Sequence, residues 1–166
     1  MRQKVFVCVL ILISCFYSCK DDDSPTQYLQ IVAELPVYCA NSNEQGLISK
    51  DELVNKVFVY NSKEDVKNNF TEAFLNKFPD YLHIDFTKYS LLVKTSIVDY
   101  EILNKKISFY LKNRDTQNIY HYQIDYYVGE QCADNEYFIE RSAIVVDKIM
   151  GNNIVESGYS YSKQYK

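Results

Sequence analysis

Hydrophobic and polar positions alternate with a period of two along most of the chain after residue 90, the pattern of half-buried strands. The pattern predicts five strands, over Leu91 to Val98, Ile102 to Lys112, Ile119 to Val128, Tyr137 to Ile149 and Ile154 to Tyr161. Polar turn residues separate the later strands at Asn113 to Asp115, Gly129 to Asn135 and Gly151 to Asn153. Because these connections are short, they favour hairpins, and we expect an antiparallel meander.

The spacing between residues 62 and 76 is that of a helix. One apolar stripe is formed by Val66, Phe70, Ala73 and Phe74. Ser62 stands three residues before Asp65, the spacing of an N-cap, and Pro79 ends the pattern. We therefore expect one main helix from Ser62 to Asn76 that packs on the sheet.

Two earlier segments also have strand character. Tyr28 to Cys39 reads as a first strand, in which Pro36 favours an edge position or a bulge, and Lys56 to Tyr60 reads as another. Together the elements predict an α+β domain, with an antiparallel meander of about five to seven strands and one main helix. Its length suits a single domain over residues 28–166.

The N-terminus has the pattern of a secretory leader. Arg2 and Lys4 precede an unbroken apolar run from Val5 to Ile13, which ends in small residues and cysteines. The alternative is an uncleaved anchor, but a membrane-spanning helix needs about 20 apolar residues. We expect residues 1–18 to be a lipoprotein signal peptide.

Two cysteines compete for the acylated position at the end of this leader. Cys15 has the better match to a lipobox in the residues before it, whereas Cys19 has aromatic residues there. Cys19 is followed at once by Lys20, Asp21, Asp22 and Asp23, which resemble the acidic export tag of surface lipoproteins. We therefore expect lipidation at Cys19, with Cys15 as the alternative, and an acidic tether over residues 19–27. These features predict a lipid anchor in the outer membrane, with the domain facing the cell exterior.

The net charge limits the classes of partner, and the cysteines bear on the redox environment of the protein. The formal charge of −4 becomes −6 once Arg2 and Lys4 leave with the leader, which argues against nucleic acid as a partner. Cys39 and Cys132 are the two cysteines of the folded part. An exported protein meets an oxidising compartment, so a disulfide between them is one expectation and two free thiols are the other.

Three blocks of sequence carry a resemblance to known proteins. They are the strand Val57 to Tyr60, the helix opening Asn61 to Asp65, and the Ile-Asp-Phe-Thr-Lys-Tyr-Ser-Leu-Leu block over Ile84 to Leu92. The chain resembles a family of small anchored lipoproteins of uncharacterised function, and more weakly the C-terminal domain of PrcB-like protease-complex inhibitors. The resemblance covers about residues 57–128 and implies a helix before a β-meander, but it transfers no catalytic residue.

Candidate chemistry is sparse. His83 and His121 have no metal-ligand spacing to a cysteine or to each other, and the strand pattern places His121 on the polar side, with Gln123 and Asp125. The chain has no nucleophile elbow, phosphate loop or zinc-peptidase helix. Asp134 and Glu136 are a carboxylate pair of the kind that serves glycoside hydrolysis, but an acidic hairpin loop is the default interpretation. We expect no enzyme, no catalytic residue, no metal and no cofactor.

Tyrosine is the more informative residue type, with 16 Tyr and no Trp in the chain. Tyrosine gives interfaces a large rigid ring with a polar tip, although most of these rings are expected to fill the core or cover the sheet. The expected function is a membrane-anchored binding module with an unknown protein or glycan partner, and inhibition of a protease is one form that this binding could take. The alternative is a small cell-envelope hydrolase. A pocket with His83 or His121 beside a carboxylate would favour the hydrolase, and a shallow exposed tyrosine face would favour binding.

Overall fold

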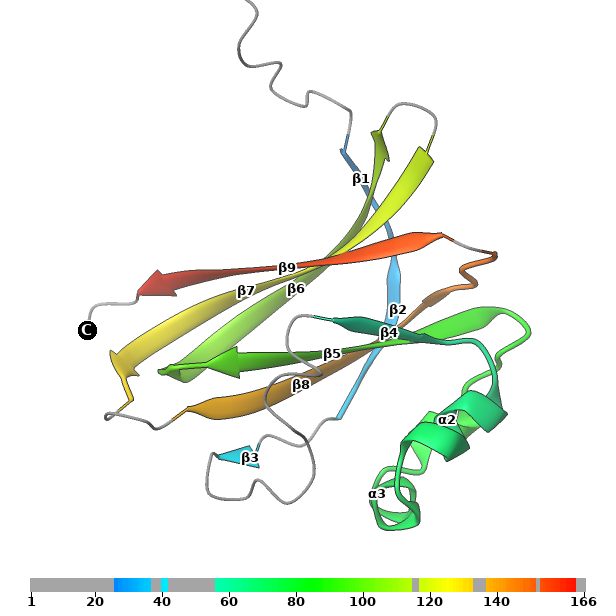
Figure 1. Cartoon of the computed structure of the whole chain (residues 1–166), viewed down its shortest axis with the longest axis horizontal. Helices are drawn as coiled ribbons and strands as arrows, with labels where there is room; N and C mark the ends of the chain where they lie inside the picture. Colours follow the sequence, from blue (N-terminus) through cyan, green and yellow to red (C-terminus); the bar gives the residue numbers. More distant parts are fainter. Residues whose placement is uncertain are drawn as a thin grey trace, which may run out of the picture.

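A computed structural model describes residues 26–36, 40–41, 56–114, 117–132, 137–151 and 153–163, and statements about the structure concern these residues. Strands make up most of them (Figure 1). The strands are β1 (Thr26–Tyr28), β2 (Ile31–Leu35), β3 (Ala40–Asn41), β4 (Val57–Tyr60), β5 (Tyr89–Val98), β6 (Tyr100–Arg114), β7 (Gln117–Gln131), β8 (Phe138–Asp147) and β9 (Ile154–Lys163). Three short helices follow β4, namely α2 (Lys63–Asn69), α3 (Glu72–Lys77) and α4 (Asp80–His83).

The strands form two sheets rather than the single meander that we expected. Sheet A has the order β1-β6-β7-β9, and sheet B has the order β2-β8-β5-β4, with β3 paired to β8 beside this path. Every pairing is antiparallel except that of β7 with β9, which is parallel. The five predicted strands after residue 90 are all present within a few residues of their expected bounds.

The meander prediction was wrong because only one of the expected hairpins forms. β6 and β7 pair directly across the turn after Arg114. In contrast, β7 leads into β8 and β8 leads into β9, and each of these steps passes from one sheet to the other. β8 is buried on both faces at Ile144, Val145 and Val146, so it takes a central place in the covered sheet. The crossing through β8 is what allows β9 to return parallel to β7.

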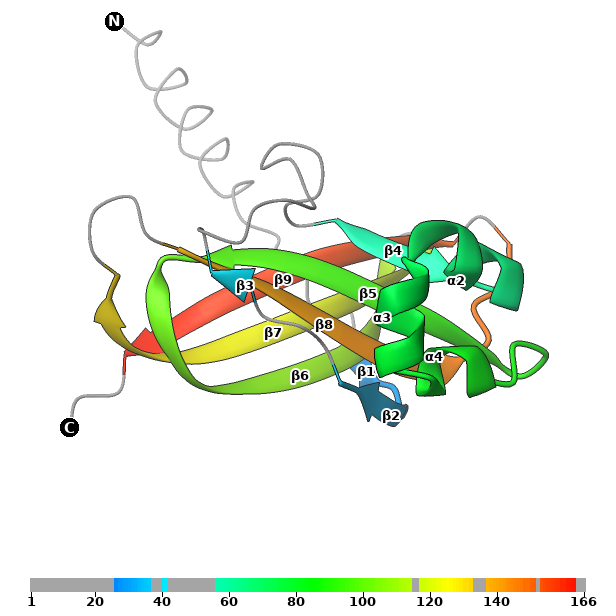
Figure 2. The same cartoon turned by 90° about the horizontal axis from the view of Figure 1, so that it is seen from below.

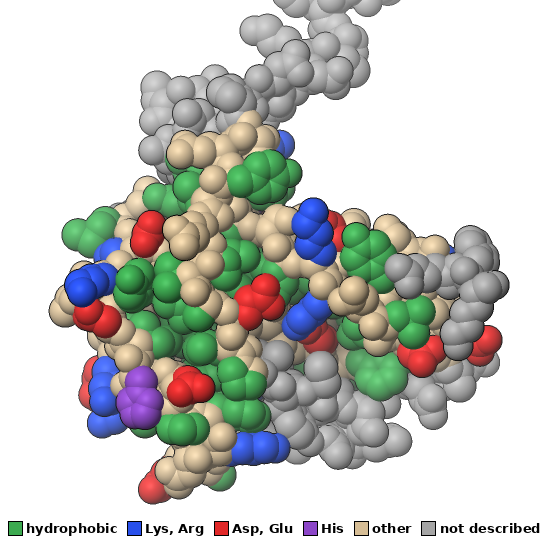
Figure 3. Space-filling model, turned by 180° about the vertical axis from the view of Figure 1, so that it is seen from behind, with side chains coloured by type: hydrophobic (Ala, Val, Ile, Leu, Met, Phe, Trp, Pro, Cys, Tyr) green, Lys and Arg blue, Asp and Glu red, His purple; other side chains and the backbone are tan. Residues whose placement is uncertain are grey.

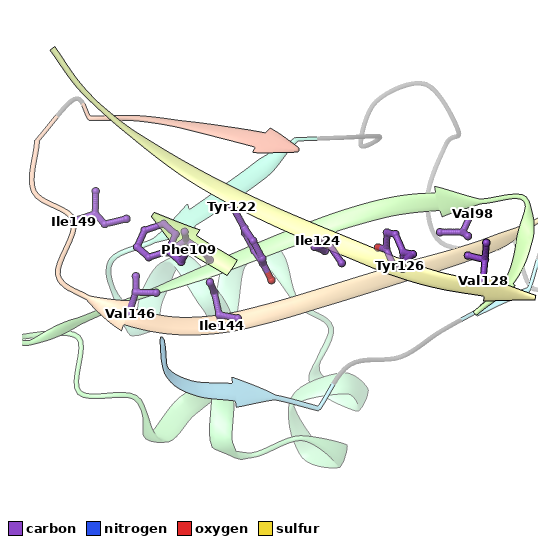
Figure 4. Packing of buried hydrophobic residues seen from close by; sticks show 10 residues of the cluster. Val98, Phe109, Tyr122, Ile124, Tyr126, Val128, Ile144, Val146 and Ile149 are labelled. Atoms are coloured by element: carbon purple, nitrogen blue, oxygen red, sulfur yellow. The ribbon is translucent and has the colours of Figure 1, made fainter. Parts of the chain in front are cut away.

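The two sheets pack face to face around the main hydrophobic core. Alternate residues of β7 point into it, and Tyr122, Ile124, Tyr126 and Val128 have no exposed surface. Sheet B contributes its own inward side chains, including Ile144 (Figure 4). The strand pattern that placed His121, Gln123 and Asp125 on the polar side of this strand is therefore confirmed, because the residues between them face the core.

The helices form a third layer on the other face of sheet B. Figure 2 shows them together over one end of β5 and β8. Their buried side chains, with Val66 and Tyr81 as the most enclosed, join a second core with Leu91 and Val145. Because sheet B is covered on both faces, β5 is buried along nearly its whole length, including its polar residues Lys94, Thr95 and Ser96.

The expected helix from Ser62 to Asn76 is broken into α2 and α3. It begins as predicted, since Ser62 Oγ accepts a hydrogen bond of 3.0 Å from the Asp65 amide. The chain then becomes extended at Phe70, and Thr71 caps α3 by accepting a bond of 3.3 Å from the Phe74 amide. The threonine hydroxyl accepts from a backbone amide and so offers the chain an alternative to a continuous helix. The first helix therefore ends after two turns, and a second helix begins at this cap.

The expected first strand, Tyr28 to Cys39, is also divided. β1 pairs with β6 in sheet A, whereas β2 pairs with β8 in sheet B. β2 ends at Leu35, next to Pro36, where a strand must lose a backbone donor. The N-terminal segment of the domain therefore contributes an edge strand to each sheet.

Candidate functional site

Several predicted sites lie outside the described residues. Cys15, Cys19, the Lys20 to Asp23 tag, Cys39, and the carboxylate pair Asp134 and Glu136 all belong to this group. Lipidation, the export tag and the disulfide therefore stay predictions. Cys132 is described, and it is half-buried just after β7, where its amide donates a hydrogen bond of 3.0 Å to the Asp99 carbonyl.

The two histidines lie on different layers. His83 is the exposed last residue of α4. His121 lies on the outer face of sheet A, as expected, where its ring stacks on Tyr110 with centroids 5.0 Å apart. Its Nδ1 atom is 3.6 Å from Glu156 Oε2 on β9. This is the histidine beside a carboxylate that would suit a hydrolase.

The outer face of sheet A does not assemble a catalytic triad around His121. Ser160 Oγ donates a hydrogen bond of 2.7 Å to Asp125 Oδ1, which also accepts one of 2.9 Å from Gln123. Asp125 and His121 are four residues apart on one strand, so their backbones are separated by about 13 Å. The Ser160 and Asp125 pair is therefore too distant to activate this histidine.

A pocket of about 340 Å³ lies between the helix layer and sheet B. The rings of Phe70, Phe74 and Phe78 line one side, with successive centroids 5.0 and 4.9 Å apart. Arg141 of β8 and Lys77 of α3 add two cations to the lining. The break between α2 and α3 helps to shape this pocket, because Asn69 through Phe74 belong to the segment where the chain turns.

Arg141 is the most unusual member of this lining. It is half-buried, and it makes no ion pair or hydrogen bond with any described residue. Burial lowers the pKa of its guanidinium, and the phenols of Tyr60 and Tyr81 act in the opposite direction. A guanidinium carries five donors, and those of Arg141 still reach solvent, because none of its nitrogens is a fully buried atom without a hydrogen bond.

A second polar cluster lies inside the sandwich, between the two sheets. Glu140 of β8 accepts hydrogen bonds from Lys105 of β6 and from the Tyr126 hydroxyl of β7. Nearby, the Tyr122 hydroxyl donates a bond of 2.8 Å to Ser142 Oγ. Apart from the half-buried Lys105, these groups are buried, and they largely satisfy one another, which suits a structural role that fixes how the sheets face each other.

Lys94 belongs to the same interior and has no exposed surface. Its ammonium group donates a hydrogen bond to the Gly158 carbonyl of β9, and it lies 5.4 Å from the centre of the Tyr159 ring. Burial lowers the pKa of Lys94 to about 8, although the charge of Glu140 partly opposes this. Lys94 therefore links the inner face of sheet B to the edge strand of sheet A.

Exposed tyrosines gather near the end of β9. We define the tyrosine strip as Tyr159 and Tyr161 of β9 together with the half-buried Tyr100 of β6, whose neighbouring ring centroids lie 5.6 and 5.4 Å apart. Tyr159 is 44% exposed and Tyr161 is 38% exposed. The Tyr161 hydroxyl donates a bond of 3.3 Å to the Ile97 carbonyl, and partial burial raises its pKa to about 12. These contacts hold the rings in place.

Charges are dispersed on the face seen from behind Figure 1. Figure 3 shows Lys and Arg side chains scattered among Asp, Glu and hydrophobic side chains, with no broad area of one sign in the described surface. Within the described residues, no three or more His, Cys, Asp or Glu side chains come together as a metal site. The described helices are also too short and too polar for any of them to cross a bilayer.

Comparisons with known proteins give no further guidance, because the chain matches no protein-family model, no curated protein and no solved structure. Sequence reasoning missed the two residues with the most unusual environments, Arg141 and Lys94. In each case, the sequence feature that could have indicated an unusual environment was a basic residue inside an otherwise apolar or alternating strand. Such a residue is normally placed at the surface, and only its neighbours in the fold show otherwise.

Proposed function

We propose that this protein is a lipid-anchored binding module of the cell envelope, which holds a partner protein against the tyrosine strip. The observation that supports it is the pair of exposed, positioned rings at Tyr159 and Tyr161, with the half-buried ring of Tyr100 beside them. Rings that are already fixed lose little conformational entropy on binding, which is why tyrosine is frequent at interfaces. The resemblance to protease-complex inhibitors makes a protease one partner class to test.

The test compares exposed tyrosines on two edges of sheet A. The soluble domain from Ser24 onward is immobilised and incubated with outer-membrane extract, and Tyr159→Ala is compared with the control Tyr28→Ala. Tyr28 is 73% exposed on β1 and lies outside the strip. We expect Tyr159→Ala to weaken capture about tenfold or more, the effect of losing an interface anchor, and Tyr28→Ala to leave it unchanged. Equal capture by both variants would contradict the proposal, and loss of binding to deglycosylated extract would assign a glycan partner instead.

The anchor is part of the same proposal and is tested separately. We propose acylation of Cys19 in the outer membrane, with the domain outside the cell. Cys19→Ala should leave an unprocessed precursor that takes up no labelled palmitate, whereas Cys15→Ala should still be labelled. The reverse pattern would move the anchor to Cys15. Protease added to intact cells should degrade the domain, and full protection would refute the outward orientation.

The hydrolase alternative depends on His121 and Glu156, which lie 3.6 Å apart at their nearest polar atoms. Neither residue lines the pocket between the helices and sheet B. Binding is therefore the better supported function. Hydrolysis of an envelope substrate that disappears in His121→Asn would reverse this preference.

A further inference from the structure

The pocket between α2, α3 and β8 combines an aromatic wall with the half-buried guanidinium of Arg141. Phe70, Phe74 and Phe78 form the wall, and Arg141 lies in the lining opposite the helices. No Asp or Glu is present in the described lining, whereas Lys77 adds a second positive charge. The pocket thus combines an apolar surface with the guanidinium of Arg141.

Arg141 is partly withdrawn from water without a described partner, although its nitrogens still reach solvent. A half-buried guanidinium loses hydration, and here no described carboxylate or carbonyl replaces it. Charges withdrawn from water are normally paired, as Glu140 of sheet B is with Lys105 of sheet A between the two sheets. An acceptor supplied from outside would remove this penalty at Arg141.

We propose that this pocket binds a small carboxylate with an aromatic or other apolar body. The carboxylate would accept hydrogen bonds from Arg141, and the body would pack against the wall formed by Phe70, Phe74 and Phe78. Arginine matches a carboxylate with two parallel hydrogen bonds, and stacked rings accept a flat apolar group. A volume of about 340 Å³ lies within the range of small-molecule sites. The site shares no residue with the tyrosine strip, so the inference does not depend on that strip.

Fluorescence offers a direct test, because the chain has no tryptophan and indole emission therefore belongs to the probe alone. The probes are indole-3-propionate and its primary amide, which differ only in the charged group. The full-length protein in detergent is titrated against each probe, and anisotropy is measured. We expect saturable binding of the carboxylate with a dissociation constant of about 1 mM or below. The amide should bind about tenfold or more weakly, since it loses a charge-assisted hydrogen bond.

Substitutions then test whether Arg141 is the group that binds the carboxylate of the probe. Arg141→Gln should weaken the carboxylate to the level of the amide, so that the ratio between the two probes falls to about one. Lys106→Gln, an exposed change on β6, is the matched control and should leave both probes unchanged. Equal binding of acid and amide to the unsubstituted protein, or no saturable binding of either, would overturn the proposal.

A stability measurement separates a ligand-binding arginine from a structural one. Arg141→Met removes the unpaired charge and keeps an apolar stem, so its melting temperature should rise by a few degrees. The carboxylate probe should raise the melting temperature of the unsubstituted protein but not that of Arg141→Met. A large fall in the melting temperature of Arg141→Met would show that the guanidinium supports the fold, which would overturn the inference.

A carboxylate beside an apolar group also occurs at the C-terminus of a polypeptide. The peptide Gly-Gly-Phe and its C-terminal amide are therefore added as a second pair of probes. Weaker binding of this peptide than of indole-3-propionate supports a small-molecule ligand. Tighter binding of the peptide, lost in its amide, would overturn the small-molecule assignment in favour of a chain terminus.

Discussion

Lys94 makes the stability of this protein depend on pH in an unusual direction. Its side chain is fully buried between the sheets, near Glu140 and under Tyr159, and its pKa is lowered from 10.5 to about 8. In the unfolded chain the same ammonium keeps its ordinary pKa. Between these two values the unfolded state holds more protons than the folded state, so the free energy of unfolding rises with pH.

The size of this rise follows from the two pKa values. Integrating the proton difference from about pH 7 to about pH 9.5 gives a gain of about 2 kcal/mol from Lys94 alone. Above about pH 10 the effect is opposed by buried tyrosines. Burial raises the pKa of Tyr81, Tyr122 and Tyr126, so the unfolded state loses these protons first and stability falls. The free energy of unfolding should therefore be greatest between about pH 9.5 and about pH 10, where the rise due to Lys94 ends and the fall due to the tyrosines begins.

Urea unfolding followed by circular dichroism, at several pH values and with reductant present, measures this profile. The unsubstituted protein should gain about 2 kcal/mol over the stated interval, and Lys94→Met should lose this gain. Lys106→Met, at an exposed position on β6, controls for other groups that titrate in the interval and should keep the gain. A rise of the same size in Lys94→Met would refute the assignment to Lys94.

Three further predictions concern local contacts. Ser62→Ala should lower the free energy of unfolding by about 1 kcal/mol in urea titrations, because the first helix loses its cap; no change would show that the cap is dispensable. Tyr122→Phe should lower the free energy of unfolding by about 1 to 2 kcal/mol, because it leaves the buried Ser142 hydroxyl without its donor. Adding Ser142→Ala should recover part of this loss. Strictly additive losses in the double mutant would argue against the contact. Thiol alkylation of protein purified without reductant should modify neither Cys39 nor Cys132, and modification of both in the native protein would exclude their disulfide.

The strands could be predicted from sequence because alternation reports which side chains face the core. The five strands after residue 90 and the strand at Val57 to Tyr60 all appear in the structure. Alternation does not report which strand lies alongside, so the division into two sheets and the parallel return of β9 were missed. The doubly buried run at Ile144 to Val146 was a sign that this strand is central and covered on both faces.

Charged residues inside the fold were harder to predict, since their surroundings come from distant parts of the chain. The acceptor of Lys94 is the Gly158 carbonyl, 64 residues away. Arg141 meets rings from the helix layer, including Phe74, that no local pattern connects to β8. The helix break at Thr71 was a local feature, but the apolar stripe that continues across it favoured one uninterrupted helix.

The division of the N-terminal segment between the two sheets has a consequence for biosynthesis. β1 pairs with residues of β6 that lie more than 80 positions later, and β2 pairs with residues of β8 more than 100 positions later. A ribosome releases the chain from its N-terminus, so both strands emerge long before their partners exist. Neither sheet can be completed early, and the nascent chain stays open for most of its synthesis. Such a chain is well suited to a translocation channel, which accepts polypeptides before they fold.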